Sequence, residues 1–398
     1  MIAIDGFPLL FLPGGIKSYL IAILKALNAS DQLGEKKFVI LLPKIDQKIS
    51  AFYHSEIKEL EETLNDHFTF QYFTMSPILF RLFLIFRSRD EIIRRYTLFI
   101  WEHYSIPRIV AKLRPSVIFH PYQAVSDYKT SACKVVVVHD IFHWDKDQHY
   151  TYIVKRLYHT YKSGCVSSDT LITISQTSKD EILRYLRVDE KKIVVCYEGV
   201  DDLFLTFKPS SEKEREIVDQ YKLPKKYLLA LVSVREYKNI KGVIEVFNLV
   251  SKKDPEFRLV LVGWALESNT VIVDYIRANK LEDKIVTIPK LSKHQDLAYL
   301  YHGSYAFLFL SFKEGFGLPP LEAIACNSLS VVSNVSAVGE IYNGILPSFD
   351  PKAYQEVADY ILSLTAQQRN EAIILAQKKL LDVYSWEKVL PQYLQYLS

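Results

Sequence analysis

Short apolar runs alternate with stretches of helical pattern along the whole chain. The runs expected to form buried strands are residues 2–4, 38–42, 68–73, 116–120, 134–138 and 170–175 in the first half, and 227–234, 257–262, 284–288 and 306–311 in the second. Uninterrupted apolar strands separated by helices are typical of parallel sheets that are covered on both faces. The pattern therefore predicts an α/β protein, and the similar order of elements in both halves predicts two Rossmann-like domains.

A polar stretch interrupts this pattern near the middle of the chain. Residues 203–224 are rich in charged side chains, and we expect them to contain the linker between the two domains. The length of 398 residues also exceeds what one hydrophobic core usually supports. We therefore place an N-terminal domain at residues 1–205 and a C-terminal domain at residues 206–383.

The stretch with the clearest chemistry is residues 314–323. A predicted strand leads into a loop that contains Gly315 and Gly317, and prolines precede the helix expected after it. The free N–H groups and the dipole at the start of such a helix favour phosphate, and glycines let the backbone approach a ligand closely. Glu314 and Glu322 would accept hydrogen bonds from sugar or ribose hydroxyls. The stretch predicts a site for a polyol phosphate; the alternative is an ordinary connection between strand and helix.

Two glutamates eight positions apart around a glycine loop resemble the signature of retaining, nucleotide-sugar-dependent glycosyltransferases of family 4. The resemblance covers most of the chain and is strongest from 227 to 345. It implies the GT-B fold, in which two Rossmann-like domains with parallel sheets face each other across a cleft. The acceptor side would be the N-terminal domain, joined by a final helix at about 384–398, and the C-terminal domain would bind the donor.

The resemblance also assigns roles around the glycine loop. In the family, the first glutamate contacts the donor sugar, the loop amides contact sugar and diphosphate, and the second glutamate holds the nucleotide ribose. The residues that take these roles here are Glu314 for the sugar, Gly315, Phe316, Gly317 and Leu318 for the loop, and Glu322 for the ribose. Residues 333–340 resemble the segment that follows this helix in the family.

Basic residues precede a helix expected from about Ile240. Residues 233–239 resemble the family segment whose basic groups neutralise the donor diphosphate. Lys238 matches the position of the family's lysine, whereas Arg235 is offset from the usual arginine and Val232 stands where glycine is usual. Cations at a helix N-terminus oppose the helix dipole unless an anion is present, which favours the phosphate role over a solvated pair.

The N-terminal half has two further matches at strand ends. Gly14 and Gly15 resemble the glycine-rich loop that lies near the donor phosphates and the acceptor. His139 and Asp140 end a predicted strand and resemble the family's strand in which the histidine points at the donor sugar, with the aspartate in support. A histidine that only caps the strand is the alternative. Asp5, just after the first strand, is expected to be a cleft residue.

The implied activity is transfer of a hexose or deoxyhexose from a nucleotide sugar to a saccharide or lipid-linked saccharide, in surface polysaccharide biosynthesis. Loop N–H groups, Lys238 and Arg235 would stabilise the departing diphosphate, so no metal and no cofactor are expected. No Asp-x-Asp pair stands directly at the end of a predicted strand, where it would hold a metal-bound diphosphate. Retention would come from front-face attack, whereas retaining glycosidases use a carboxylate nucleophile, so Glu314 is not expected to be one.

Two other functions fit parts of the sequence. A sugar-nucleotide epimerase on the same fold would turn over the donor without an acceptor. A degenerate, non-catalytic subunit would explain the departures from the family pattern at Val232, Ser233 and Glu198, the last of which replaces the usual asparagine. The retained glutamates, lysine and histidine argue against that second alternative.

Charge and cysteine usage exclude several classes of protein. The net charge of +3 and the lack of a basic run argue against nucleic acid as a partner. Four widely spaced cysteines form no C-x-x-C pair, and neither a signal peptide nor a long apolar segment is present, which predicts a cytoplasmic protein.

Residues 76–115 combine apolar and aromatic positions with eight basic and three acidic residues. This composition fits two arrangements. In one, an amphipathic segment lies on an anionic membrane, which would place the enzyme at the inner face of the membrane and suit a lipid-linked acceptor. In the other, two helices pack on the protein and expose their arginines to water.

Overall fold

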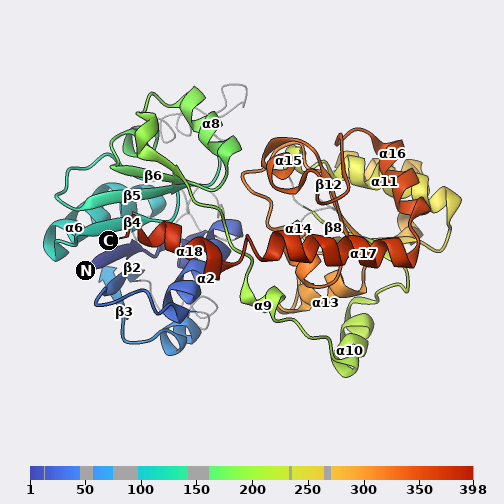
Figure 1. Cartoon of the computed structure of the whole chain (residues 1–398), viewed down its shortest axis with the longest axis horizontal. Coiled ribbons are helices and arrows are strands. Elements are labelled where there is room, and N and C mark those ends of the chain that lie inside the picture. The colour runs from blue at the N-terminus through green and yellow to red at the C-terminus, as the bar shows by residue number, and fades with distance from the viewer. Residues whose placement is uncertain are drawn as a thin grey trace. The chain divides into compact units, whose positions relative to one another are not determined.

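A computed structural model describes residues 1–12, 14–44, 57–74, 97–141, 161–232, 235–263 and 270–397. The chain divides into two compact units (Figure 1): unit 1 is Met1–Glu198 with Val389–Ser398, and unit 2 is Gly199–Lys388. Each unit is built on one parallel sheet, as the apolar runs predict, and the predicted α/β class is confirmed.

Within the described residues, unit 1 contains a seven-stranded sheet of order β3-β2-β1-β4-β5-β6-β7. Its strands are β1 (Ile2–Asp5), β2 (Phe38–Lys44), β3 (Phe68–Thr74), β4 (Val117–His120), β5 (Cys133–Val138), β6 (Thr170–Thr173) and β7 (Ile193–Val195). Its helices are α1 (Phe7–Phe11), α2 (Gly15–Ala29), η1 (Trp101–Ser105), α6 (Ile106–Leu113), α8 (Gln176–Tyr185) and η3 (Glu190–Lys192). In the register of the central strands, Ile4 lies beside both Ile40 and Phe119.

Unit 2 contains a six-stranded sheet of order β10-β9-β8-β11-β12-β13 in its described part. Its strands are β8 (Tyr227–Leu231), β9 (Arg258–Val262), β10 (Ile285–Ile288), β11 (Ala306–Phe309), β12 (Ser330–Ser333) and β13 (Ser348–Phe349). Its helices are α9 (Asp202–Leu205), α10 (Ser211–Tyr221), η4 (Glu236–Lys238), α11 (Ile240–Lys253), α12 (Thr270–Ala278), η5 (Glu282–Lys284), α13 (Asp296–Gly303), α14 (Pro319–Ala325), α15 (Ser336–Tyr342), α16 (Tyr354–Ser363), α17 (Ala366–Ala376) and η6 (Gln377–Leu381). The chain returns to unit 1 within α18 (Trp386–Leu394).

The strand order reverses at an equivalent place in both sheets. Each sheet has its first strand, β1 or β8, between two neighbours reached in opposite directions, so the reversal lies between β1 and β4 in unit 1 and between β8 and β11 in unit 2. Ligands of open parallel sheets bind outside the carboxyl ends of the strands at such a reversal. The two reversals are therefore the first places to look for a site.

The polar stretch 203–224 differs from the predicted linker because it contains α9 and α10 of unit 2. Ser210 caps α10, since its side chain accepts a hydrogen bond from the backbone N–H of Lys213 at 3.2 Å. Ile217 is the buried residue of this helix, and most of its other residues are exposed. A solvated helix has the same composition as a linker, which is why the sequence pattern misleads here.

Candidate functional site

The glycine loop of unit 2 leads from β11 to α14. Gly317 has φ 96°, and a Cβ at this position would come 3.2 Å from the ring of Phe309. A side chain would be strained in this conformation, so the loop needs glycine here. Proline occupies the first turn of α14, and Glu322 is the acid of that turn, as predicted.

Lys238 and Glu314 meet although 76 positions separate them. The Lys238 Nζ donates to both carboxylate oxygens of Glu314, at 2.7 and 2.9 Å. Lys238 lies at the end of η4, and its ammonium group is 5.4 Å from the centre of the Phe309 ring. Glu314 is 8% exposed, so this carboxylate depends on its partner for neutralisation. The structure thus brings two predicted site residues into direct contact.

A cavity of about 200 Å³ opens at the reversal between β8 and β11. Lys238 is the charged residue of its lining; the other lining residues are Leu231, Val232, Ile240, Val243, Leu308, Phe309, Leu310, Ser311 and Pro319. An apolar hollow with one fixed cation at the carboxyl ends of parallel strands is suited to a ligand with an anionic group.

Glu322 and Arg235 lie at opposite ends of this region of the sequence. The buried Tyr301 of α13 donates its hydroxyl proton to Oε2 of Glu322 at 3.0 Å, which fixes one oxygen of the carboxylate. Arg235 is exposed at the start of the η4 turn. The ribose role of Glu322 and the phosphate role of Arg235 stay predictions.

Unit 1 holds the predicted site residue His139, and both of its ring nitrogens have hydrogen-bond partners. Nδ1 lies 3.1 Å from Oε1 of Glu198, and Nε2 lies 2.9 Å from the carbonyl oxygen of Pro121. The Tyr19 ring packs edge-on against the imidazole, with the ring centres 4.6 Å apart. Burial alone would lower the pKa of His139, but Glu198 outweighs it and raises this pKa above its usual value. Glu198, the residue that departs from the family pattern, is thus the counter-ion of His139.

Gly14, Gly15 and Asp140 lie near the ends of elements in the same unit. Gly14 precedes α2 with φ 90°, and a Cβ on either glycine would meet no atom within 4 Å. Asp140 accepts a hydrogen bond from Nε2 of Gln123 through its backbone carbonyl at 3.1 Å. Helix α2 also contributes Tyr19, so it links the glycines to His139 within this unit.

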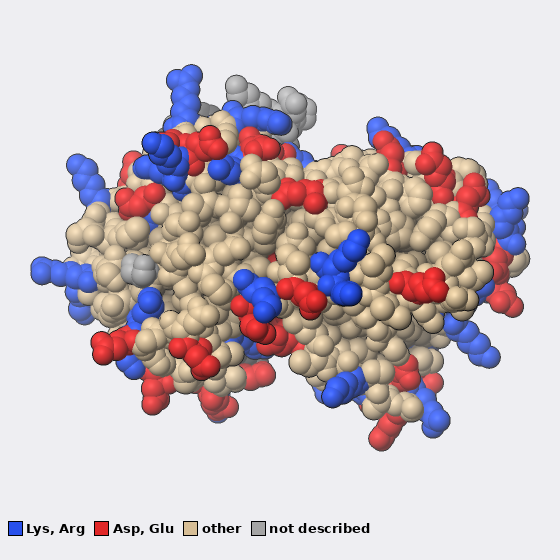
Figure 2. Space-filling model, in the orientation of Figure 1, with Lys and Arg blue, Asp and Glu red and all other residues tan. Residues whose placement is uncertain are grey.

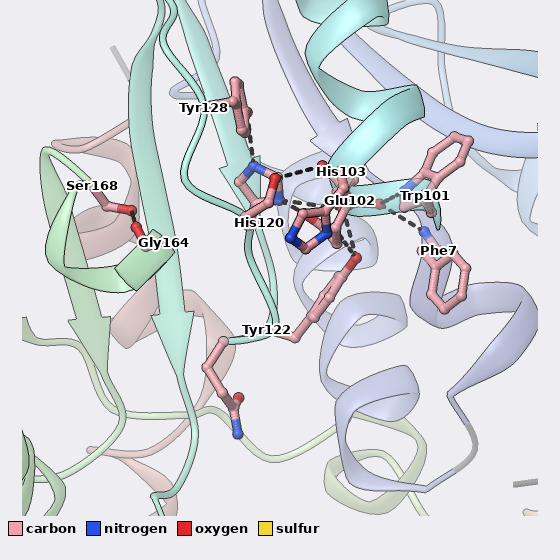
Figure 3. Close-up of polar contacts among 12 residues, drawn as sticks. Phe7, Trp101, Glu102, His103, His120, Tyr122, Tyr128, Gly164 and Ser168 are labelled. Atoms are coloured by element: carbon pink, nitrogen blue, oxygen red, sulfur yellow. Dashed lines mark hydrogen bonds and ion pairs between the residues drawn. The ribbon is translucent and has the colours of Figure 1, made fainter. Parts of the chain in front are cut away.

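Asp5 is not a cleft residue, contrary to its prediction. Its carboxylate is fully buried at the reversal between β1 and β4 and accepts hydrogen bonds from the indole of Trp101, the hydroxyl of Tyr122 and the backbone N–H of Phe7. Figure 3 labels these three donor residues. His120 Nδ1 lies 3.2 Å from the second oxygen. Asp5, at the polar end of β1, is covered by η1 and by the chain after β4. The sequence pattern of β1 alone does not reveal this packing.

A tyrosine hydroxyl lies between two carboxyl groups in this cluster. The Tyr122 hydroxyl is 2.7 Å from Asp5 Oδ2 and 2.5 Å from Glu102 Oε1. Asp5, Glu102 and His120 each offer a ligand atom within 4.8 Å of the others, which is a spacing that a metal ion tolerates. A metal bound to both carboxylates would, however, have to displace this hydroxyl. We therefore assign the cluster to a proton-sharing network.

The network predicts an unusual pH dependence of stability. Burial, followed by the charge of Asp5, raises the pKa of Glu102 well above its usual value, so this carboxyl keeps its proton. Its stabilising contribution is complete below the unfolded value near 4.5 and is lost as pH rises through the raised folded pKa. Between these two pKa values the native chain should lose up to about 1.4 kcal/mol of unfolding free energy per pH unit. We expect Glu102→Gln, which imitates the protonated acid, to abolish this loss.

Urea titrations at pH 5, 7 and 9 check this expectation, with the exposed Glu59→Gln as the matched control. Asp5 acts with the opposite sign: burial would raise its pKa, but the bonds and charge of His120 lower it below the usual 3.8. Its contribution is present above that value and is lost as pH falls through the lowered pKa. An equal alkaline loss of stability in Glu102→Gln and the native chain would contradict a buried proton on Glu102.

Two family comparisons match this chain. Residues 71–202 match the family described as Glycosyltransferase Family 4, and residues 212–379 match the family described as Glycosyl transferases group 1. Together the matches cover most of the chain, in the order in which the two units follow each other. The chain belongs to the family 4 glycosyltransferases. Lys238, Glu314 and Glu322 all lie in the group 1 match of this family 4 protein.

Curated relatives of this family 4 glycosyltransferase include mannosyltransferases. It is 24% identical over 192 residues to the serotype-specific mannosyltransferase WbdA of Escherichia coli, which covers 48% of this chain and 24% of WbdA. It is 28% identical over 233 residues to the O-antigen chain mannosyltransferase B of E. coli, covering 57% and 59%. The GDP-mannose:cellobiosyl-diphosphopolyprenol alpha-mannosyltransferase of Xanthomonas oryzae is 26% identical over 164 residues, covering 39% and 42%. The matches span about a quarter to about three fifths of these relatives.

Solved structures resemble the family 4 chain along its whole length. A glycosyltransferase from Rickettsia africae has a TM-score of 0.68 at 17% identity, with 100% of this chain and 97% of that chain covered. HepE of Anabaena in complex with UDP-glucose has a TM-score of 0.69 at 17% identity, with 100% and 98% covered. These likenesses confirm the predicted GT-B fold class.

Residues 76–115, for which the sequence left a membrane-bound and a packed arrangement open, are described in part, because residues 75–96 lie outside the described ranges. In the described part, Trp101, Ile106 and Val110 are buried in the core of unit 1, which agrees with packed helices there. No described helix combines the length and the apolar character that crossing a bilayer requires. Figure 2 shows basic and acidic side chains interspersed on the face in view, without a large patch of one sign.

Proposed function

We propose that this protein transfers a mannosyl residue from a nucleotide sugar, GDP-mannose, to a saccharide or lipid-linked saccharide in surface polysaccharide biosynthesis. The observation that carries the proposal is the contact between Lys238 and Glu314 beside the cavity of unit 2. The sugar and the diphosphate of a donor are directly bonded, so a residue that binds the sugar should lie beside one that binds the diphosphate. The sugar comes from the names of the relatives, among which mannosyltransferases recur.

The proposed reaction breaks the bond between C1 of the sugar and the β-phosphate oxygen and forms a bond from C1 to an acceptor hydroxyl oxygen. Electrons of the broken bond stay on the diphosphate, where Lys238 and backbone N–H groups of the glycine loop stabilise the negative charge. The hydroxyl proton passes to the departing phosphate oxygen on the same face, which retains the configuration at C1. Glu314 binds the sugar, and no metal ion is part of the proposal.

The remaining residues receive roles consistent with this reaction. Glu322 accepts hydrogen bonds from the ribose, Arg235 adds positive charge near the diphosphate, and the Gly14–Gly15 turn admits the phosphates or the acceptor. His139 lies near the sugar, and Glu198 favours the protonated form of its ring. We further propose that the enzyme works in the cytoplasm.

A thermal-shift screen tests the donor site. A ligand that binds only the folded protein at 100 times its Kd stabilises it by about 2.7 kcal/mol, which raises the melting temperature of a domain of this size by about 5 °C or more. We expect GDP and GDP-mannose to give such a shift at millimolar concentration and UDP-glucose to give a much smaller one. Mannose-labelled product formed with a membrane saccharide fraction would then test the transfer.

Three outcomes of the screen and the product analysis would contradict the proposal in different ways. A shift with UDP-glucose alone would replace the donor. Conversion of GDP-mannose to an epimer without an acceptor would replace transfer by epimerisation. No shift with any nucleotide or nucleotide sugar would favour a non-catalytic subunit.

A further inference from the structure

The backbone of Glu314 is held by one side chain from the element that follows β12. The hydroxyl of Ser336 accepts a hydrogen bond from the N–H of Glu314 at 3.1 Å and donates one to the C=O of the same residue at 2.9 Å. A single hydroxyl therefore satisfies both polar groups of one peptide residue. This reciprocal pair fixes the position and the rotation of the Glu314 backbone.

Ser336 makes this contact from a left-handed conformation. Its φ of 58° is uncommon for a residue with a side chain and costs free energy that glycine would not incur. A serine that keeps this strain indicates that its hydroxyl is used. Glycine is the residue that the local backbone alone favours.

The chain around Ser336 leaves little room for adjustment. A Cβ on Gly339 would come 2.4 Å from the carbonyl oxygen of Asn334, so α15 packs closely on the residues that lead into it. The N–H of Asn334 also donates to the carbonyl of Phe349 at 2.8 Å, next to the sheet. The residues that lead into Ser336 are therefore anchored on β13.

The same helix holds the glycine loop at a second point. The hydroxyl of Tyr342, at the end of α15, donates to the carbonyl of Gly317 at 2.5 Å. Helix α15 thus contacts the loop at Glu314 and at Gly317, which flank Gly315 and Phe316. The Glu314 carboxylate in turn rests against Lys238.

We propose that Ser336 is a positioning residue that sets the Glu314 carboxylate for the donor sugar. The inference rests on the proposed function, in which Glu314 binds the sugar and Lys238 the diphosphate. Without the two hydrogen bonds from the Ser336 hydroxyl, Tyr342 would still hold the loop, but the backbone of Glu314 could rotate. Recognition of the sugar would then weaken while recognition of the nucleotide would stay.

Affinities for GDP and for GDP-mannose, measured by isothermal titration calorimetry, separate these two parts of the donor. We expect Ser336→Gly, which removes the hydroxyl and relieves the strain, to raise the Kd for GDP-mannose about tenfold and to leave the Kd for GDP within about twofold. Glu314→Gln should give a similar selective loss. Because both variants act on one carboxylate, the double variant should be no weaker than the weaker single variant.

Lys222→Gly is the matched control for strain relief, since Lys222 has φ 52° at the end of α10. It should bind both ligands like the native chain. Ser336→Ala keeps the strain, and it should lose sugar affinity as Ser336→Gly does. Three results would overturn the role of Ser336 and leave the proposed function intact. They are native GDP-mannose affinity in both Ser336 variants, an equal loss of affinity for GDP and GDP-mannose, and additive losses in the double variant. A native chain that binds neither ligand would overturn the proposed function first.

Discussion

Replacing Lys238 by methionine should lower kcat/KM for GDP-mannose by about 10²-fold to 10³-fold. The substitution removes the cation that would meet the diphosphate as it departs, and interactions of this kind supply several kcal/mol of a reaction barrier. It also leaves the 8% exposed carboxylate of Glu314 without its partner. The release of GDP in the presence of acceptor measures the effect.

The control for this prediction is Lys241→Met in the first turn of α11. Lys241 is exposed and lies over the ring of Tyr275, with 5.6 Å between its Nζ and the ring centre. It carries the same charge within the same segment, so a loss of general electrostatic attraction would appear in both variants. Comparable turnover of Lys238→Met and the native enzyme would remove Lys238 from the diphosphate site.

Asn239→Ala should destabilise unit 2 by about 3 kcal/mol. The side chain is 4% exposed, donates from Nδ2 to the carbonyls of Leu310 and Pro351 at 2.9 and 2.8 Å, and accepts from the N–H of Gly242. The variant would lose a helix cap worth about 1 kcal/mol and leave two buried carbonyls without this donor. Its φ of 52° adds strain that asparagine tolerates better than alanine. Urea titration measures the loss.

Two further variants separate these contributions. Asn239→Gly removes the carboxamide but accepts the left-handed backbone, so it should be about 1 kcal/mol less damaging than Asn239→Ala. Asn327→Ala changes an exposed asparagine with φ 62° and should cost about 1 kcal/mol. If Asn239→Ala cost no more than Asn327→Ala, the buried bonds to Leu310 and Pro351 would not anchor this loop.

Much of the fold could be predicted because most of the parallel strands are continuous apolar runs. Residues 306–311 and 134–138 contain β11 and nearly all of β5, and the errors are one or two residues at strand ends. The start of α14 was also predictable, because proline and glycine act through the local backbone. The first-turn position of Glu322 followed from the same local rule.

The partners of the site residues could not be predicted, because they come from distant segments. The contact of His139 with Glu198 joins residues 59 positions apart. The departure from the family pattern at Glu198 was visible in the sequence, but the sequence did not show which residue its carboxylate contacts. Ser336 stood within a segment that matched the family, but its hydroxyl acts through a φ of 58° that the residue type does not suggest. Asp5 followed a strand like a ligand-binding residue, and only the packing of η1 shows that it is covered.

The two crevices at equivalent strand reversals have been put to opposite uses. In the described part of the chain, the one between β8 and β11 opens into a cavity beside Lys238, whereas the one between β1 and β4 is filled by a tyrosine and two carboxyl groups. One of two similar sheets has therefore kept an open niche at its reversal, while the reversal of the other sheet has become part of the interior. Changes of sugar or base preference during evolution should accordingly accumulate in residues 199–388, while the reversal between β1 and β4 stays constant across enzymes with different donors.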